Sequence, residues 1–338
     1  MEPPYDFEVE KIAKYVKEKR YSLVLLQLPD GMKRYAAELV DALRDATGAE
    51  FYVHGEPCWG PCVVPIEEAK SLGVQLIVHY GHRPRGYAAL LPREPEVIFV
   101  PASLRSPGLS EHLVEQLVSE LRARECSKPV LITTAQHDWL LPRLVERLAA
   151  EDLEPVMRGA IEHSVLGCDY GPLIELRGAY QCVVVLASGV FHALGAALST
   201  DVPTLQVDPI EEKVIDLASM KRTWLRRRYA KIIASLKAER WALWAGSPPG
   251  QHRRELILKL ADLIRAKKLK YYLFYSRNVS SAELLNADSP QIDVHVVTSC
   301  PRVPIDDFTL QEFHKPVLSP GEALMVLTGD LERYRFPW

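Results

Sequence analysis

Three cysteines in this chain stand where an apolar stretch gives way to a polar loop. Cys300 follows the apolar run of residues 292–297, and Pro301 directly after it prevents further strand pairing. Cys62 and Cys168 are also flanked by glycine, proline or polar residues. Thiolates are ligands for soft metals, and three of them on a four-iron cluster leave one iron open to a substrate. These cysteines are therefore the first candidates for chemistry.

A repeated spacing supports this choice. Gln27 ends one predicted strand and Thr133 ends another, and Cys62 follows the first at the same distance along the chain as Cys168 follows the second. A strand, a polar turn and an amphipathic helix recur three times, at intervals slightly over 100 residues, which is typical of an internal triplication of parallel α/β units. The three predicted strands are residues 23–28, 129–134 and 242–246.

Cys300 occupies a different place in the repeat. It lies as far beyond Gly246 as Gly81 lies beyond Gln27 in the first repeat. In the second repeat, Ser188 stands within one position of the same offset from Thr133. Cys300 therefore corresponds to the end of the next strand. If the carboxyl ends of the strands converge, where ligands bind to parallel sheets, the three thiols can meet.

The predicted fold class is α/β, with three homologous parallel-sheet domains in a pseudo-threefold arrangement around a central cluster. The predicted domains are residues 1–106, 107–210 and 211–338. Each closes with a further short strand, at residues 96–100, 203–207 and 316–318. A helical stretch over residues 211–239 is expected to join the second domain to the third. Its basic run Arg226–Arg228 indicates either a solvated face or a docking surface for an acidic partner.

Composition excludes several classes of protein. The 338 residues are 48% hydrophobic and 25% charged, with a net charge of −3 that gives no signal for nucleic-acid binding. No stretch is apolar enough for a membrane span, and the first residues do not resemble a signal peptide, so a cytoplasmic protein is expected. Six cysteines are too sparse for a disulfide framework, and Cys126 and Cys182 are expected to be unpaired core residues.

The three cysteine segments resemble those of the archaeal 2-(3-amino-3-carboxypropyl)histidine synthase family, which catalyses the first step of diphthamide biosynthesis. The similarity extends over essentially the whole chain. Two positions depart from the family pattern: Val63 stands where an aspartate is common, and Cys58 where a small or polar residue is common. Cys58 is therefore a rival to Cys62 as a ligand. The matching segments are residues 27–31, 55–62, 79–82, 133–137, 165–168, 246–251, 298–307 and 315–323.

This resemblance implies a homodimer in which Cys62, Cys168 and Cys300 of each protomer hold a 4Fe–4S cluster. It further implies that S-adenosylmethionine is cleaved at the bond from sulfur to the γ-carbon, which yields methylthioadenosine. The resulting 3-amino-3-carboxypropyl radical adds to a histidine of translation elongation factor 2. The sequence does not indicate the electron donor, and it gives no sign of a membrane or nucleic-acid partner.

The amino and carboxylate groups of S-adenosylmethionine need polar partners near the cluster. The best local candidates are Arg302, Asp306 and Asp307, whose alternative role is an ion-pair network within their loop. Further candidate contacts at the strand ends are Gln27, His82 and Ser188, and His79 and His192 at similar positions are candidates to line the cleft.

Two other functions fit part of the same pattern. Quinolinate synthase also resembles a pseudo-threefold α/β protein with one cysteine per domain, but its iron acts as a Lewis acid in a dehydration. A non-enzymatic iron–sulfur sensor is the third hypothesis. The run from Cys300 to Asp307, with its long upstream helix, favours the synthase.

Overall fold

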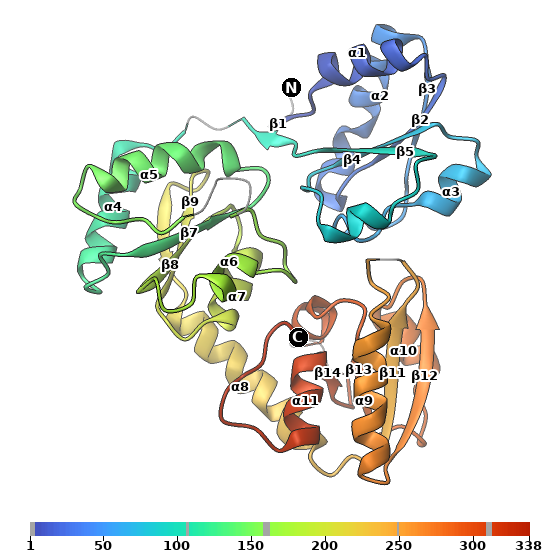
Figure 1. Cartoon of the computed structure of the whole chain (residues 1–338), viewed down its shortest axis with the longest axis vertical. Coiled ribbons are helices and arrows are strands. Elements are labelled where there is room, and N and C mark those ends of the chain that lie inside the picture. The colour runs from blue at the N-terminus through green and yellow to red at the C-terminus, as the bar shows by residue number, and fades with distance from the viewer. Residues whose placement is uncertain (1–3, 106–107, 158–162, 249, 309–312) are drawn as a thin grey trace.

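Three four-stranded sheets form the framework of the protein in the computed structural model, which describes residues 4–105, 108–157, 163–248, 250–308 and 313–338. Figure 1 shows the three units at the corners of a triangle, with the carboxyl terminus beside β14, on the side of the third unit that faces the second. Within the described residues, no helix is long and apolar enough to cross a membrane.

The first sheet is fully parallel, in the order β3-β2-β4-β5. Helices α1 and α2 cover one face and α3 the other, because alternate strand residues point to opposite sides. Helix α2 ends at Gly48, whose φ of 73° suits a residue without a side chain. The elements are α1 (Val9–Lys19), β2 (Leu23–Gln27), α2 (Ala36–Thr47), β3 (Glu50–Val53), α3 (Ile66–Ser71), β4 (Leu76–Tyr80) and β5 (Glu96–Val100).

The third sheet repeats this topology, in the parallel order β12-β11-β13-β14. Helices α9 and α11 pack on one face and α10 on the other. The same strand order in two units far apart in the chain agrees with the predicted triplication. The elements are β11 (Arg240–Gly246), α9 (Arg254–Ala266), β12 (Lys270–Ser276), α10 (Ser281–Ala287), β13 (Val294–Val297), β14 (Val317–Leu318) and α11 (Pro320–Thr328).

The second sheet is a variation of the same plan. Strands β7, β8 and β9 are parallel, whereas β10 pairs antiparallel with β9. The strand that corresponds to β3 is reduced to two parallel bridges, Val130 to Val156 and Thr133 to Ser164. The elements are α4 (Glu111–Arg122), β7 (Pro129–Thr133), α5 (Leu141–Ala149), α6 (Gly171–Glu175), β8 (Cys182–Leu186), α7 (Val190–Ser199), β9 (Thr204–Asp208) and β10 (Lys213–Asp216).

The connections between units differ from the expectation in one place. The predicted helix over 211–239 is wrong at its start, where β10 forms because the half-buried Val214 and Ile215 pair with β9; α8 (Ala218–Ser235) follows. The second sheet therefore extends beyond residue 210.

The first boundary, at residues 106 and 107, lies outside the described residues. Next to it, β1 (Tyr5–Asp6) pairs with β6 (Ser103–Leu104), and the Leu104 amide donates to Gln136 in the second unit.

Two of the cysteines form a disulfide, which the sequence analysis did not anticipate. Cys126 follows α4 and Cys182 begins β8, and packing of α4 on the sheet brings their Cα atoms to 6.1 Å. The expectation of unpaired core thiols is wrong because two residues 56 positions apart become neighbours only through tertiary packing. The disulfide lies at the amino end of β8, opposite the end that leads to Ser188.

A buried ion pair ties α8 to the third unit. Arg228 and Glu322 have fully buried side chains, and Arg228 Nε donates to Glu322 Oε1 at 2.7 Å. The same guanidinium donates to the carbonyls of Pro304 and Val317 at 2.8 Å, and the Tyr334 hydroxyl donates to Glu322. The basic run Arg226–Arg228 favours a solvated face or a docking surface, and this prediction is wrong for Arg228. This residue instead braces the loop that carries Cys300.

Replacing Arg228 with Met should strongly destabilise the third unit, because Glu322 would remain buried without its cation. Loss of one partner of such a pair costs about 3–5 kcal/mol. Denaturant unfolding followed by the fluorescence of the buried Trp241 and Trp244 should report the change. The matched control is Arg44→Met, because Arg44 pairs with Glu50 at the surface; it should change stability by no more than about 0.5 kcal/mol. Equal effects of the two variants would contradict the bracing role.

Candidate functional site

Cys62 lies where the first unit meets the third. Its thiol accepts a hydrogen bond from Gln251 Nε2, with a donor-to-sulfur distance of 3.7 Å. Gly250 packs so closely that a Cβ atom there would lie 2.7 Å from both Cα and Cβ of Cys62. Since Gly250 and Gln251 follow β11, the strand end of the third sheet holds the cysteine loop of the first.

Cys168 belongs to the second unit and is held by the carboxyl-terminal segment. The Trp338 indole N–H donates to the Cys168 carbonyl at 3.2 Å, and the Arg253 guanidinium lies over the Trp338 ring at 3.6 Å from its centroid. Gly167 packs against Phe191 and the stem of Arg302, with no room for a Cβ atom. Residues from the second and third units therefore hold the segment that carries Cys168.

Cys300 follows β13 in the third unit. The Thr298 amide and hydroxyl both donate to the Trp244 carbonyl, which fixes the end of the strand. A single turn of π-helix, Val303–Asp307, comes next, and the Val303 amide donates to the Cys300 carbonyl. Such turns are frequent at functional sites. Hydrogen bonds on both sides of Cys300 therefore hold this loop in place and restrict the position of its thiol.

Electrostatic coupling among the three thiols indicates that they lie near one another. Burial raises the pKa of the Cys168 thiol, and the neighbouring thiols of Cys300 and Cys62 raise it further. Burial and then Cys62 raise the pKa of Cys300 to about 11, opposed in part by Arg302. Burial also raises the pKa of Cys62, opposed by Gln251 and Arg253. Three partly buried thiols from three units thus share one site with two cations beside it.

This donor set fits a polynuclear metal group. Among the described residues, the groups whose three ligand atoms all lie within 4.8 Å of one another are Cys58/His79/His82 and His54/Glu56/Glu68. The thiols of Cys62, Cys168 and Cys300 are spaced more widely, which suits an iron–sulfur cluster better than a single ion. Thiolate is the ligand type that such clusters require.

Arg302 is the cation of the site that the sequence analysis singled out. Its side chain is 5% exposed and binds Asp306 through two hydrogen bonds of 2.8 Å, so the predicted loop ion pair is present. The guanidinium lies over the Phe191 ring at 3.8 Å, and its buried Nη1 has no hydrogen-bond acceptor among the described residues. Burial raises the pKa of Asp306 and of Asp307. One donor of Arg302 is therefore unpaired among the described residues.

A cavity of about 480 Å³ lies between the first and second units. Its lining includes His82 and Ser188, as the sequence analysis expected, together with His137 and His192. Gln27 does not line it: this side chain is buried and donates to the Val63 carbonyl at 2.6 Å. His79 is likewise buried, behind the cavity wall.

The cavity histidines are uncharged near neutral pH. Burial lowers the pKa of His82 and of His137 to about 4, and that of His192 to about 3, with Arg302 contributing to the last. His137 Nε2 lies 3.0 Å from Ser188 Oγ, which donates to Asp208 at 3.2 Å. The cavity wall is therefore polar without a positive charge from its imidazoles.

Sequence reasoning missed Arg253, Trp338, Phe191 and Asp208 as parts of the site. Arg253 could have been found, because it follows Gly250 and Gln251 in the loop after β11, the counterpart of the loops after β2 and β7. Trp338 and Phe191 carried no comparable signal, since only tertiary packing brings them to Arg253 and Arg302.

Comparison with known proteins identifies the family. The model described as "Putative diphthamide synthesis protein" matches residues 28–335. The chain belongs to this family. It is 32% identical over 334 residues to 2-(3-amino-3-carboxypropyl)histidine synthase of Pyrococcus horikoshii, covering 97% of this chain and 91% of the relative. It is 28% identical to subunit 1 of the human 2-(3-amino-3-carboxypropyl)histidine synthase, covering 96% and 72% of the two chains.

A solved structure of the family agrees with the fold. The crystal structure of Dph2 from Pyrococcus horikoshii with a 4Fe–4S cluster superposes with a TM-score of 0.84 at 30% identity, over 98% of this chain and 93% of that one. The α/β fold with three parallel-sheet units in a pseudo-threefold arrangement is thereby confirmed.

Replacing Gly250 with Ala should disturb the loop of Cys62, because the new Cβ would overlap the backbone of that cysteine. We expect a clear loss of iron after anaerobic reconstitution, measured by metal analysis and visible absorption. Gly55→Ala is the matched control, since a Cβ at Gly55 has no neighbour within 4 Å. Normal iron content in Gly250→Ala would show that this contact does not position Cys62.

Proposed function

We propose that this chain transfers the 3-amino-3-carboxypropyl group of S-adenosylmethionine to a histidine of translation elongation factor 2, the first step of diphthamide biosynthesis. The observation that carries the proposal is the meeting of Cys62, Cys168 and Cys300 from three units, in a chain similar to the synthase along its whole length. This function also implies a cytoplasmic location, where elongation factor 2 works.

Cys62, Cys168 and Cys300 are the proposed ligands of a 4Fe–4S cluster. A reduced cluster with three protein ligands supplies an electron and an open iron for cleavage of a sulfonium bond. The protein's part is to hold the thiols in place and to bind S-adenosylmethionine in one orientation. Arg253 and Arg302, which lie beside the thiols, offset the negative charge of three thiolates.

Arg302 is the proposed partner of the substrate carboxylate. Its Nη1 is buried and unpaired among the described residues, whereas its other donors are fixed by Asp306, so the guanidinium is already oriented. A charge-assisted hydrogen bond from this donor to a carboxylate is stronger than one between neutral groups. Asp306 then acts by orienting Arg302, and Asp307 by adding negative charge near the substrate ammonium group.

The cavity lined by His82, His137, Ser188 and His192 is the proposed place of the rest of S-adenosylmethionine. Its volume of about 480 Å³ is within the usual range for small-molecule sites. Uncharged imidazoles do not repel the sulfonium cation, so the lowered pKa values of His137 and His192 favour binding near neutral pH. Gln27 acts from behind this wall, through Val63 and His79.

The regiochemistry of cleavage tests the function. Incubated anaerobically with dithionite, S-adenosylmethionine and elongation factor 2, the reconstituted protein should release methylthioadenosine as the main nucleoside, detected by chromatography. Elongation factor 2 should gain the mass of one 3-amino-3-carboxypropyl group. Formation of 5′-deoxyadenosine, or no turnover by an intact reduced cluster, would contradict the proposal and favour Lewis-acid chemistry of the quinolinate-synthase type.

Cysteine variants show whether the proposed ligands carry this activity. The reconstituted parent protein should contain about four iron atoms per chain. Ala at Cys62, Cys168 or Cys300 should abolish product formation and remove most of this iron. The control is the Cys126→Ala/Cys182→Ala pair, which removes the disulfide and should keep cluster and product. Loss of iron from Cys58→Ala with full iron in Cys62→Ala would contradict the assignment of the first ligand.

We propose that the protein forms a homodimer, in which a twofold interface leaves each protomer its own cluster site. The resemblance to the synthase family supports this assembly. Light scattering should give about twice the chain mass of 38.1 kDa. An active monomer would contradict it.

A further inference from the structure

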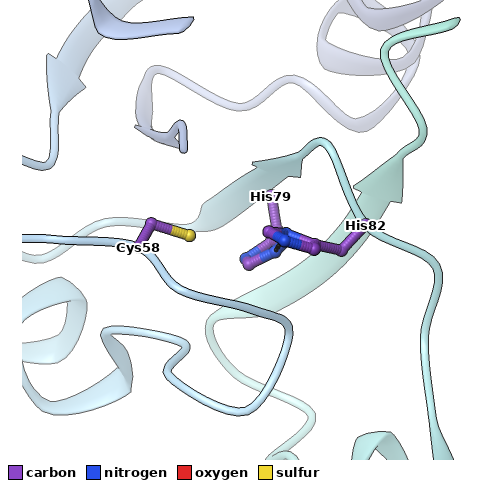
Figure 2. A group of neighbouring side chains, drawn as sticks. All are labelled: Cys58, His79 and His82. Carbon is purple, nitrogen blue, oxygen red and sulfur yellow. Dashed lines mark hydrogen bonds between the residues drawn. The ribbon is translucent and has the colours of Figure 1, made fainter. Parts of the chain in front are cut away.

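Cys58, the fourth free cysteine, faces two histidines. Figure 2 shows its sulfur pointing toward the rings of His79 and His82, and one ligand atom from each residue lies within 4.8 Å of the other two. Cys58 comes from the loop between β3 and α3, His79 from β4, and His82 from the residues just after β4. Three metal-ligating side chains therefore meet within the first unit.

The orientation of His79 is fixed by the residues behind it. Its Nδ1 lies 2.7 Å from Gln27 Oε1, and Gln27 Nε2 donates to the Val63 carbonyl, which fixes the direction of the amide. Because Oε1 accepts only, Nδ1 carries the proton, and the lone pair of Nε2 points toward His82. The Phe99 ring lies 5.0 Å from the His79 ring and limits its rotation. A ligand histidine that donates its second N–H to a carbonyl is a recurring feature of metal sites.

Burial favours the uncharged form of all three groups. Burial keeps both imidazoles neutral, the form that binds metals, by lowering the pKa of His79 and of His82. Burial also raises the pKa of the Cys58 thiol to about 12. A divalent cation between these groups stabilises the thiolate and uses the lone pairs of both imidazoles.

We propose that Cys58, His79 and His82 bind one Zn²⁺ ion, at a site distinct from the three cluster ligands. One thiolate and two imidazoles are typical zinc ligands. Usual zinc bond lengths place the ligand atoms of a tetrahedral site about 3.3–3.6 Å apart. His79 Nε2 and His82 Nδ1 are 2.9 Å apart as acceptor and donor of a hydrogen bond. Zinc binding needs the His82 proton to move from Nδ1 to Nε2, and the separation to widen by a few tenths of an ångström. His82 also lines the cavity, from which water can supply the fourth ligand.

Such an ion would fasten the loop of the first unit to β4. Cys58 precedes Cys62 by four residues, with Gly60 and Pro61 between them. Zinc would therefore fix the segment that presents one cluster ligand, and would take Cys58 away from competition for iron. This proposal does not depend on the proposed transferase activity.

Zinc content of the cluster-loaded full chain gives the first test. The anaerobically reconstituted protein, treated with ZnCl₂ and then freed of unbound metal by gel filtration, should keep about one zinc per chain. Cys58→Ala and His82→Ala should lose it. His54→Ala is the control, because it removes the neighbouring group of His54, Glu56 and Glu68 while leaving the proposed ligands intact. The proposal is overturned if the parent protein retains no zinc, if His54→Ala loses it, or if Cys58→Ala keeps it.

Cobalt gives a second readout that needs no activity. In the full-chain variant with Ala at Cys62, Cys168 and Cys300, Co²⁺ should produce a thiolate charge-transfer band, and adding Cys58→Ala should remove it. Gln27→Ala should weaken Co²⁺ binding about 10- to 100-fold, since it removes the acceptor that orients His79. Circular dichroism checks the fold of each variant. If the triple variant does not fold, the zinc content of Cys58→Ala in the parent background decides the question instead. A cobalt spectrum without a thiolate band overturns the proposal.

Discussion

The whole architecture depends on one geometric constraint: three thiols from three separate sheets must reach one point. Parallel strands send all their carboxyl ends to the same edge, so each unit can offer loops to a shared centre only if that edge faces inward. The first and third sheets are entirely parallel, and the second keeps three parallel strands. Cys62 and Cys168 lie in the loops that precede β4 and β8, whereas Cys300 lies in the loop that follows β13, the counterpart of those strands. The three units therefore contribute to the centre from non-equivalent loops.

Close contacts between units keep this centre in place. Gly250 and Gly167 allow backbones and rings to approach where a Cβ atom has no room. Arg253 and Arg302 are each held flat against an aromatic ring while they lie beside the thiols. A stacked guanidinium loses little further freedom when a ligand binds, so much of the ordering is already complete in the folded chain.

The sequence revealed the parts of the structure that repeat. The strands around Gln27, Thr133 and Gly246 and the offsets to Cys62, Cys168 and Cys300 could be read because one unit serves as a template for the others. The resemblance to a known family added the expected chemistry of the centre. The pseudo-threefold plan was therefore accessible before any coordinates.

What the sequence concealed depends on pairings between distant segments. The disulfide of Cys126 and Cys182, the burial of Arg228 against Glu322, and the turn of Cys58 toward His79 have no local pattern. Arg228 sits in a basic run that favours a solvated face, and only the partner 94 residues later makes its burial tolerable. The residues of β10 were predicted as helix, because four residues are too short a pattern to distinguish the helical period from the alternation of a strand.

The order of the cysteines along the chain has a consequence for biosynthesis. A ribosome releases Cys62 and Cys168 well before Cys300, because most of the third unit is made between Cys168 and Cys300. At ordinary elongation rates this interval is on the order of ten seconds, during which the nascent chain carries two of the three thiols with no third unit to shelter them. The Cys126–Cys182 pair lies within the second unit and is complete early. With Cys62, Cys168 and Cys300 as the proposed ligands, metal loading has to wait for the last unit to fold and dock. The cluster would then be a product of assembly and not a nucleus for it.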